Sequence, residues 1–158
     1  PDITQVGYYS RAYYPVYEPR TYFTSSYAGN LGFAYPTALG IKVAKPDVPV
    51  VSVSGDGGFL FNSQEMAPAA QSNIATVAII FNDNAYGNVL RGQRTTFDGR
   101  TIGAELKNPD FMKLAEAYGI SGLRVNGPEE LGAALRKLID RDEPAVIEVP
   151  FGPTPSPI

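Results

Sequence analysis

Two aspartates in this chain lie among glycines or asparagines, each directly after a run of apolar residues. Asp56 lies in Gly-Asp-Gly-Gly after the run 48–54, and Asp83 lies in Asn-Asp-Asn-Ala-Tyr-Gly after the run 75–81. Glycines allow backbone N–H groups to approach an anion such as phosphate closely. Carboxylates beside a phosphate repel it unless a cation lies between them, and carboxylate and carbonyl oxygens around a diphosphate are typical of Mg²⁺. The two loops therefore predict a Mg²⁺ site that holds a diphosphate, with a plain turn as the alternative for each loop.

The elements around the loops predict that both lie at one edge of a sheet. The runs 48–54 and 75–81 are β-branched, apolar and too short for helices, so we expect two buried strands. Asn62, with Glu65 three residues later, predicts a capped helix that extends to about Gln71. One helix between two strands makes a right-handed βαβ unit with parallel pairing. Ligands of such sheets bind outside the carboxyl ends of the strands, where both loops are expected.

The rest of the chain continues the alternation of helices and strands. We expect a helix of small residues within 29–47 that ends before Pro46, a helix opened by Asn108 and Pro109, a strand at 121–125, a helix that starts at Pro128 and a last strand at 145–149. The pattern predicts an α/β fold: a doubly wound, mostly parallel sheet with helices on both faces. The predicted divisions are a tyrosine-rich opening segment, the α/β body and an extended proline-rich tail, at 1–27, 28–150 and 151–158.

The opening segment 1–27 has no clear period, so it is predicted to be irregular. It contains seven of the ten tyrosines, which are too many phenol rings for a free tail. The tyrosines either cover the edge of this domain's own core or contact a partner domain or subunit.

Composition excludes several classes of function. The 158 residues carry a net charge of -3 with interspersed signs, which argues against a nucleic-acid partner. The chain has no cysteine and no histidine, so disulfides, thiolate metal sites and histidine bases are excluded. Without a long apolar window or a signal peptide, the sequence predicts a cytoplasmic protein with no membrane partner.

The two loops together resemble a known family. The segments GDGGFLFNSQE and FNDNAYG are similar to the Gly-Asp-Gly to Asn-Asn signature of thiamine-diphosphate-dependent enzymes, in the group of acetolactate synthase, benzoylformate decarboxylase and pyruvate oxidase. Asp56 and Asp83 are 27 residues apart, which matches that family's interval between its two side-chain metal ligands. The resemblance extends over nearly the whole chain, through SSYAGNLGFAYPTALGIKVA, NPDFMKLAEAYG and PAVIEV. It implies the diphosphate-binding domain of such an enzyme.

By position, the resemblance implies a set of site residues. Asp56, Asp83 and the backbone oxygen of Ala85 would bind Mg²⁺. Gly55 is counted among the cofactor-binding residues, and backbone amides would contact the diphosphate from Gly57, Gly58, Phe59, Tyr86 and Gly87. Leu31 would support the bent cofactor, with the Gly29 carbonyl and the Leu31 amide on its aminopyrimidine ring. From the residues alone, ordinary core packing is the alternative for Leu31.

One position departs from the family pattern, which usually has Asn where this chain has Asp83. The extra negative charge strengthens attraction to a cation and repulsion of phosphate when metal is absent. Metal preference is therefore left open, and a shift by one residue would make Asn82 or Asn84 the ligand instead.

The resemblance also implies what the chain lacks. The family's activating glutamate belongs to a separate pyrimidine-binding domain, so no catalytic residue is assigned here and Glu65 is given a structural role. The chain is expected to be a fragment that lacks the first helix and strand of its domain as well as the pyrimidine and central domains. Its parent would be an oligomeric enzyme that acts on 2-oxo acids by decarboxylation or carboligation.

Three points remain open at this level. A non-catalytic module of the same fold, acting in assembly, is the alternative function. A Rossmann dinucleotide site is disfavoured because no G-x-G-x-x-G follows a strand. Arg91, Arg94 and Arg100 are candidates to contact a substrate carboxylate, but a solvated loop from Asn88 to Arg100 is the favoured interpretation.

Overall fold

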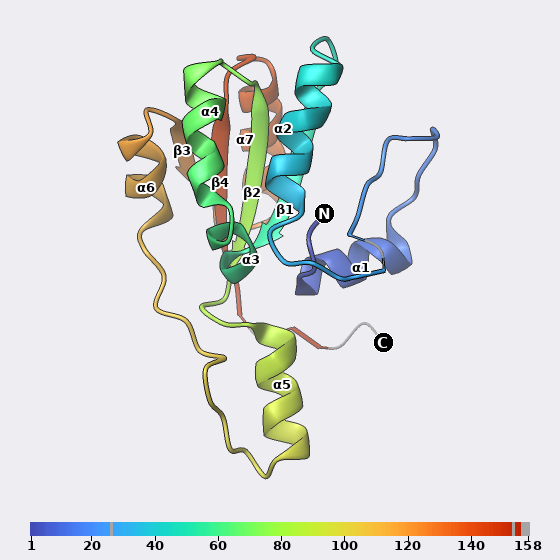
Figure 1. Ribbon diagram of the computed structural model, residues 1–158, viewed down its shortest axis with the longest axis vertical. Coiled ribbons are helices and arrows are strands. Elements are labelled where there is room, and N and C mark those ends of the chain that lie inside the picture. Colours follow the sequence, from blue (N-terminus) through green and yellow to red (C-terminus); the bar gives the residue numbers. More distant parts are fainter. Residues whose placement is uncertain (26, 153, 156–158) are drawn as a thin grey trace.

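A computed structural model describes residues 1–25, 27–152 and 154–155 of the chain. Its centre is an all-parallel sheet of β1 (Val50–Gly55), β2 (Thr76–Asn82), β3 (Ser121–Arg124) and β4 (Ala145–Pro150) (Figure 1). The strand order is β1-β2-β4-β3. β1 and β2 pair in parallel from Val50↔Thr76 to Gly55↔Phe81, so the chain leaves both strands at the same edge. The predicted βαβ unit and parallel sheet are confirmed.

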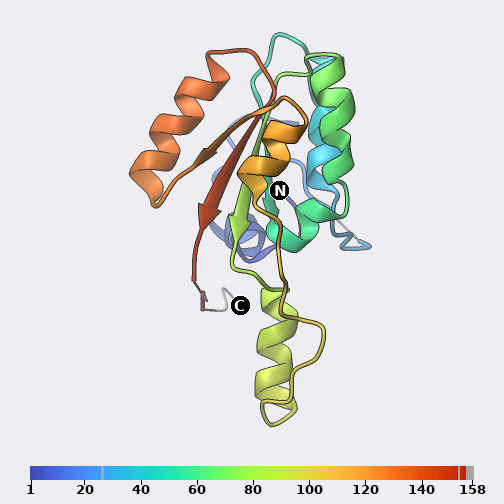
Figure 2. The ribbon, with the colours of Figure 1, turned by 90° about the vertical axis from the view of Figure 1, so that its left-hand side faces the viewer.

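Helices cover both faces of the sheet (Figure 2). On one face lie α2 (Ala34–Ala44), α4 (Met66–Gln71) and α6 (Phe111–Ala117), and on the other lies α7 (Pro128–Ile139). Side chains of a strand alternate between faces, so Ala78 and Ile80 join the first core cluster while Val77 and Ile79 join the second. Burial on both faces explains why the sequence of β2 is apolar without alternation.

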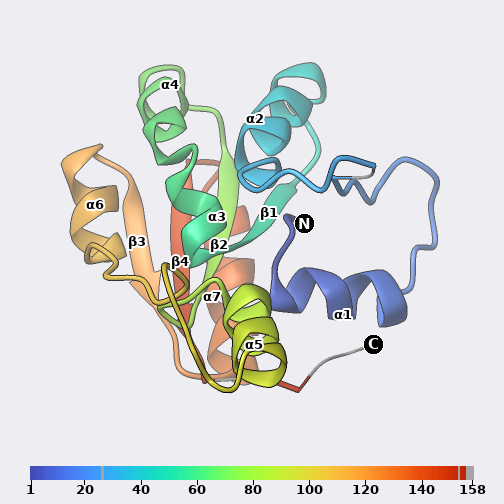
Figure 3. The same cartoon turned by 60° about the horizontal axis from the view of Figure 1, so that its bottom comes forward.

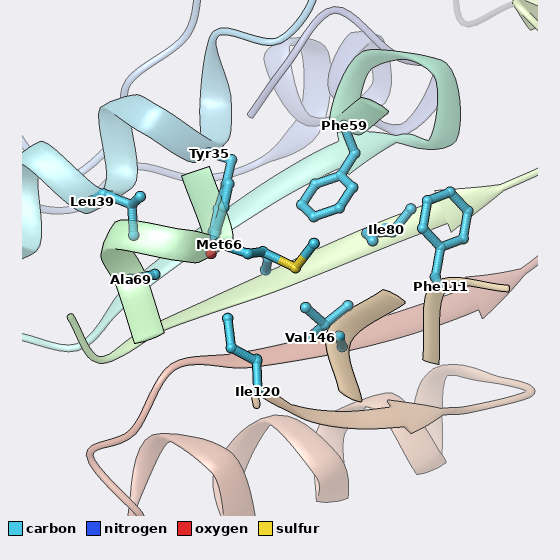
Figure 4. Packing of buried hydrophobic residues seen from close by; sticks show 11 residues of the cluster. Tyr35, Leu39, Phe59, Met66, Ala69, Ile80, Phe111, Ile120 and Val146 are labelled. Atoms are coloured by element: carbon cyan, nitrogen blue, oxygen red, sulfur yellow. The ribbon is translucent and has the colours of Figure 1, made fainter. Parts of the chain in front are cut away.

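The first core cluster gathers aromatic and aliphatic side chains beneath α2, α4 and α6 (Figure 4). The Phe59 ring lies between those of Tyr35 and Phe111, with centroid distances of 5.3 and 6.0 Å. Phe59 is 1% exposed and follows the predicted metal ligand Asp56 by three residues. The first loop of the site is therefore anchored directly in the core.

The connection from β1 to β2 differs from the predicted single helix. Helix α3 (Asp56–Leu60) begins directly after β1, and a 3₁₀ turn (Ser63–Glu65) separates it from α4. The predicted capping box is wrong, because the Asn62 side chain makes no cap hydrogen bond and its Nδ2 instead donates to the Gly32 carbonyl (2.8 Å). The predicted helix end at Gln71 is confirmed.

The opening segment is predicted to be irregular, but part of it forms helix α1 (Gln5–Tyr13). The buried residues of this helix are only Gln5 and Gly7, so it has no apolar stripe that periodicity could reveal. Tyr13, Tyr14, Tyr17 and Tyr27 are exposed. These four rings do not cover the core of the described domain. For them, the interpretation that the tyrosines cover the edge of this domain's own core is therefore wrong.

Helix α5 (Gly87–Thr96) and the returning segment 97–110 project from the carboxyl edge of the sheet (Figures 1 and 2). The predicted solvated loop from Asn88 to Arg100 is therefore helical over most of its length, and buried Leu90 anchors it. Arg94 forms an exposed ion pair with Glu105 (3.5 Å), and Arg91 donates to the Thr154 carbonyl (3.4 Å).

Helix α6 begins later than predicted. Its N-cap is Asp110, whose carboxylate accepts from the Met112 and Lys113 amides, so Asn108 and Pro109 precede the helix. The Asn108 side chain is thereby free to contact the predicted metal site.

Two smaller findings complete the fold. Of the predicted tail 151–158, residues 153 and 156–158 lie outside the described residues, while the Pro155 carbonyl accepts from the Tyr9 hydroxyl (3.0 Å). Over the described part of the chain, no helix has both the length and the apolar character of a membrane span.

Candidate cofactor and metal site

The two acidic loops meet at the carboxyl edge of the sheet, where α3 and α5 begin (Figure 3). Asp56 is 2% exposed and Asp83 is half-buried. Burial raises the pKa of the Asp83 carboxyl, and the negative charge of Asp56 raises it further. The two carboxylates therefore interact, as the predicted shared ion requires.

Several donors surround the Asp56 carboxylate. Burial raises its pKa, and this effect is opposed by the Asn108 amide and by the backbone N–H groups of Gly57, Asn84 and Ala85. Asn108 Nδ2 lies 2.6 Å from Asp56 Oδ2. These donors hold the carboxylate in place between the two loops.

The donor set fits a hard divalent cation. Among the described residues, no ion pair joins Asp56 or Asp83 to a lysine or arginine. Two interacting, partly buried carboxylates without a basic partner are unfavourable in the protein alone, and a cation would neutralise them. No group of three or more His, Cys, Asp and Glu side chains within these residues is arranged around a metal. Further ligands would therefore be neutral oxygens such as the Ala85 carbonyl, with phosphate or water.

Neighbouring side chains leave no room for a Cβ atom at several glycines of the two loops. A Cβ on Gly57 would collide with the Tyr86 ring, and one on Gly58 would lie 2.8 Å from Asp2 Oδ2. A Cβ on Gly87 would lie 2.8 Å from Asp83 Oδ2. Gly57 and Gly58 are in the first turn of α3, where N–H groups have no acceptor within the helix, whereas Phe59 lies four residues after the N-cap Gly55, whose carbonyl is the acceptor for its N–H. Gly55, the last residue of β1, packs equally closely on the Thr4 side chain.

One predicted diphosphate donor is already engaged. The Tyr86 N–H donates to the Ala104 carbonyl (2.8 Å), which ties the start of α5 to the returning segment. The Tyr86 ring packs on Gly57 instead, so Tyr86 shapes the site with its side chain.

The predicted cofactor-clamping loop lies beside α3. Its Gly32 amide donates to the buried Asp2 carboxylate (2.8 Å), whose other oxygen accepts from the Ile3 amide. Gly29 is exposed with φ +60°, and half-buried Leu31 belongs to neither core cluster. Leu31 lines an open cavity of about 570 Å³, together with Thr24, Ser25, Ala28, Asn30, Gly32, Phe33, Pro36, Thr37 and Asn62. Core packing therefore does not explain Leu31.

Gln5 and Asn108 lie at the site, although neither is among the predicted site residues and Asn108 is predicted only to open a helix. Gln5 is 6% exposed, and neither polar atom of its amide has a hydrogen-bond partner among the described residues. Its Nε2 would lie 3.2 Å from a Cβ on Gly87, beside Asp83. A buried amide without partners at the start of a helix indicates a ligand contact. No sequence signal marks Gln5, because its position depends on how α1 packs.

Gly57→Ala is expected to weaken cofactor binding more than it destabilises the fold. The added methyl group collides with Tyr86 and with Leu106, which shifts the start of α5 away from α3. Calorimetric titration with thiamine diphosphate and Mg²⁺ measures the first effect, and thermal unfolding the second. Gly40→Ala is the matched control, since a Cβ there has nothing within 4 Å and Ala favours the helix. Equal cofactor affinity for both variants contradicts the expectation.

Asp83→Asn is expected to flatten the pH dependence of stability in the metal-free chain. Because the folded-state pKa values of Asp56 and Asp83 are raised, the folded chain retains protons that the unfolded chain loses. The free energy of unfolding therefore falls as pH rises from the ordinary carboxyl pKa through the raised values. The Asp83→Asn substitution removes one of these two groups, so the free energy of unfolding should fall less steeply with pH.

Urea unfolding in a chelator, from about pH 4 to about pH 8, measures this slope. Asp47→Asn changes an exposed aspartate before β1, at the opposite end of the strand, and is expected to follow the wild type. Parallel profiles for Asp83→Asn and wild type would show that the pKa of Asp83 is not raised in the folded chain.

Comparisons with known proteins agree with this geometry. The sequence profile of the family described as "Thiamine pyrophosphate enzyme, C-terminal TPP binding domain" matches residues 2–149. The chain is 37% identical over 154 residues to the "Probable acetolactate synthase large subunit" of Methanococcus aeolicus, covering 97% of this chain and 26% of that protein. It is 38% identical over 149 residues to the acetolactate synthase of Bacillus subtilis, covering 94% and 26%.

A solved structure is similar as well. The thiamine diphosphate-dependent 4-hydroxybenzoylformate decarboxylase of Rhodococcus jostii RHA1 superposes with a TM-score of 0.77 at 33% identity, over 84% of this chain and 25% of that one. The chain thus spans about a quarter of the length of the proteins it matches. Thiamine pyrophosphate is another name for thiamine diphosphate, so the predicted cofactor class and fold are confirmed. The chain belongs to the C-terminal TPP-binding domain family of thiamine pyrophosphate enzymes.

Proposed function

We propose that this chain supplies the diphosphate- and metal-binding part of a thiamine-diphosphate-dependent enzyme that acts on 2-oxo acids. The observation that supports this most directly is the meeting of Asp56 and Asp83 at the carboxyl ends of two adjacent strands, where the charge of Asp56 raises the pKa of Asp83. The relatives support the substrate class, because their names describe acetolactate synthases and a 4-hydroxybenzoylformate decarboxylase.

In this proposal each group has one task. Asp56, Asp83 and the Ala85 carbonyl hold Mg²⁺, which neutralises the carboxylates and the diphosphate together. The backbone amides of Gly57, Gly58 and Gly87 donate to phosphate oxygens, and the Gln5 amide supplies a further polar contact. Leu31 and Gly29 contact the rest of the cofactor. When bound, thiamine diphosphate supplies the carbanion chemistry that the histidine-free chain lacks.

The exposed tyrosines support a second part of the proposal. Tyr13, Tyr14 and Tyr17 follow one another at the end of α1 and in the segment after it, and Tyr27 lies near Gly29. Aromatic residues are enriched where proteins meet, so we place a pyrimidine-binding domain or a second subunit on this surface. The same surface favours the alternative function, a non-catalytic assembly module. A cytoplasmic location remains a prediction from the sequence.

Calorimetric titration tests the proposal on the chain together with whatever further domains its gene encodes. Thiamine diphosphate should bind in the presence of Mg²⁺ and lose its affinity in excess chelator, and the loaded protein should consume a 2-oxo acid. Binding without turnover in that complete protein would favour the assembly module. Equal cofactor affinity with and without chelator would contradict the metal site.

A further inference from the structure

A buried carboxylate on β4 begins a line of polar contacts that reaches the metal site. Glu148 is 3% exposed. One of its oxygens accepts from Arg124 Nε (2.8 Å), and the other accepts from Asn82 Nδ2 (2.7 Å). Glu148 therefore joins β3, β4 and the end of β2.

The Glu148 carboxylate fixes the orientation of the Asn82 amide. A carboxylate only accepts hydrogen bonds, so it requires the NH₂ group of Asn82 to face it. Asn82 Oδ1 must then point the other way, where it accepts from the Asn84 N–H (3.2 Å) and from Asn108 Nδ2 (2.9 Å). Reversal of this amide would place NH₂ groups of Asn82 and Asn108 against each other.

The Asn108 amide is fixed in turn by the oxygens around it. Its Nδ2 lies 2.6 Å from Asp56 Oδ2, 2.9 Å from Asn82 Oδ1 and 3.3 Å from Asn84 Oδ1. Three acceptors surround a group that has only two hydrogens, so the NH₂ end must face them. Its Oδ1 is buried without a partner among the described residues, which costs stability. If Asn108 served only to hold the returning segment 97–110 in place, its amide would not need this orientation.

We propose that Asn108 is a positioning residue that fixes the Asp56 carboxylate for the cation, and that Glu148 sets Asn108 in place through Asn82. This inference rests on the proposed metal site. Hydrogen bonds behind a ligand restrict its orientation, so that less freedom is lost when metal binds. The line runs from the surface residue Arg124 across three strands to the loop that follows β1.

Metal affinity tests the proposal in the chain with whatever further domains its gene encodes. The probe is Mn²⁺ with thiamine diphosphate, and the readout is the paramagnetic resonance signal of free Mn²⁺, which needs no turnover. Asn108→Leu keeps the side-chain size but removes the donor, and should weaken Mn²⁺ binding about 10- to 100-fold. Glu148→Gln frees Asn82 to reverse, because a glutamine NH₂ can face it, and should weaken binding in the same direction.

Coupling between the two positions separates this role from simple destabilisation. The double variant should bind Mn²⁺ no more weakly than Asn108→Leu alone, because both changes interrupt one line of contacts. Asn126→Leu is the matched control: it changes an exposed asparagine whose described hydrogen bond uses only its backbone, and its affinity should equal the wild type. If Asn108→Leu does not fold, Asn108→Ser replaces it, with weaker Mn²⁺ binding expected at an unchanged melting temperature.

The outcomes divide as follows. Additive losses in the double variant would overturn the coupling of Glu148 to Asn108, and wild-type Mn²⁺ affinity in the folded Asn108 variant would overturn the role of Asn108; either result leaves the metal site standing. Wild-type protein that binds no Mn²⁺ with the cofactor would overturn both. Loss of binding in Asp56→Ala together with coupled losses at 108 and 148 would support both.

Discussion

Replacing Asp56 with alanine is expected to abolish Mg²⁺-dependent binding of thiamine diphosphate. Asp56 is 2% exposed, and its removal leaves Asp83 as the only carboxylate among the proposed ligands. The loss of affinity should exceed the 10- to 100-fold that removal of an outer partner typically causes, so we expect more than about 100-fold. Calorimetric titration with and without Mg²⁺ measures it.

The same substitution should leave the metal-free fold intact or more stable. Because burial raises the pKa of Asp56, its ionised form is unfavourable in the metal-free chain at neutral pH. Asp47→Ala removes an exposed aspartate before β1 and should retain wild-type affinity. If the two variants bind cofactor equally well, Asp56 does not hold the metal.

Replacing Phe59 with alanine is expected to cause the largest loss of stability, about 3–5 kcal/mol. The ring is almost completely buried between Tyr35 and Phe111, and no neighbour can fill the space without moving α2 or α6. Because the same turn of α3 carries Gly57 and Gly58, cofactor binding should weaken as well. Chemical denaturation measures the free energy of unfolding.

Phe61→Ala provides the comparison for this experiment. Phe61 lies two residues away in the same connection but is 55% exposed, so its loss should change stability by less than about 0.5 kcal/mol. A similar loss in both variants would mean that the first core cluster does not depend on the Phe59 ring.

The sheet and its site edge could be predicted because their signals are local. Strand β2 is continuously apolar from Val77 to Phe81 and β1 contains three β-branched valines, and each strand ends in a loop whose residue types have a distinct chemistry. Pro128 at the first turn of α7 is an equally local signal. Parallel pairing then brings Asp56 and Asp83 together without further information.

The missed features depend on contacts between distant segments. Helix α1 has no apolar stripe, so nothing in 5–13 distinguishes it from irregular chain. Asn108 resembles the start of a helix in sequence, but Asp110 takes that role. Asp56 is 52 residues away from Asn108 along the chain, and only the fold brings the two side chains together. Asn62 matches a capping box, yet Gly32 is its actual partner because α3 has already begun at Asp56.

Strand order has a consequence for how the chain folds during synthesis. Of the four described strands, β4 leaves the ribosome last, yet it lies between β2 and β3 and pairs with both. Until residues 145–150 have emerged, β3 has no neighbour in the sheet, and β2 exposes an apolar edge. The nascent domain therefore stays incomplete through most of its translation, a period in which unpaired strand edges favour aggregation or binding by chaperones.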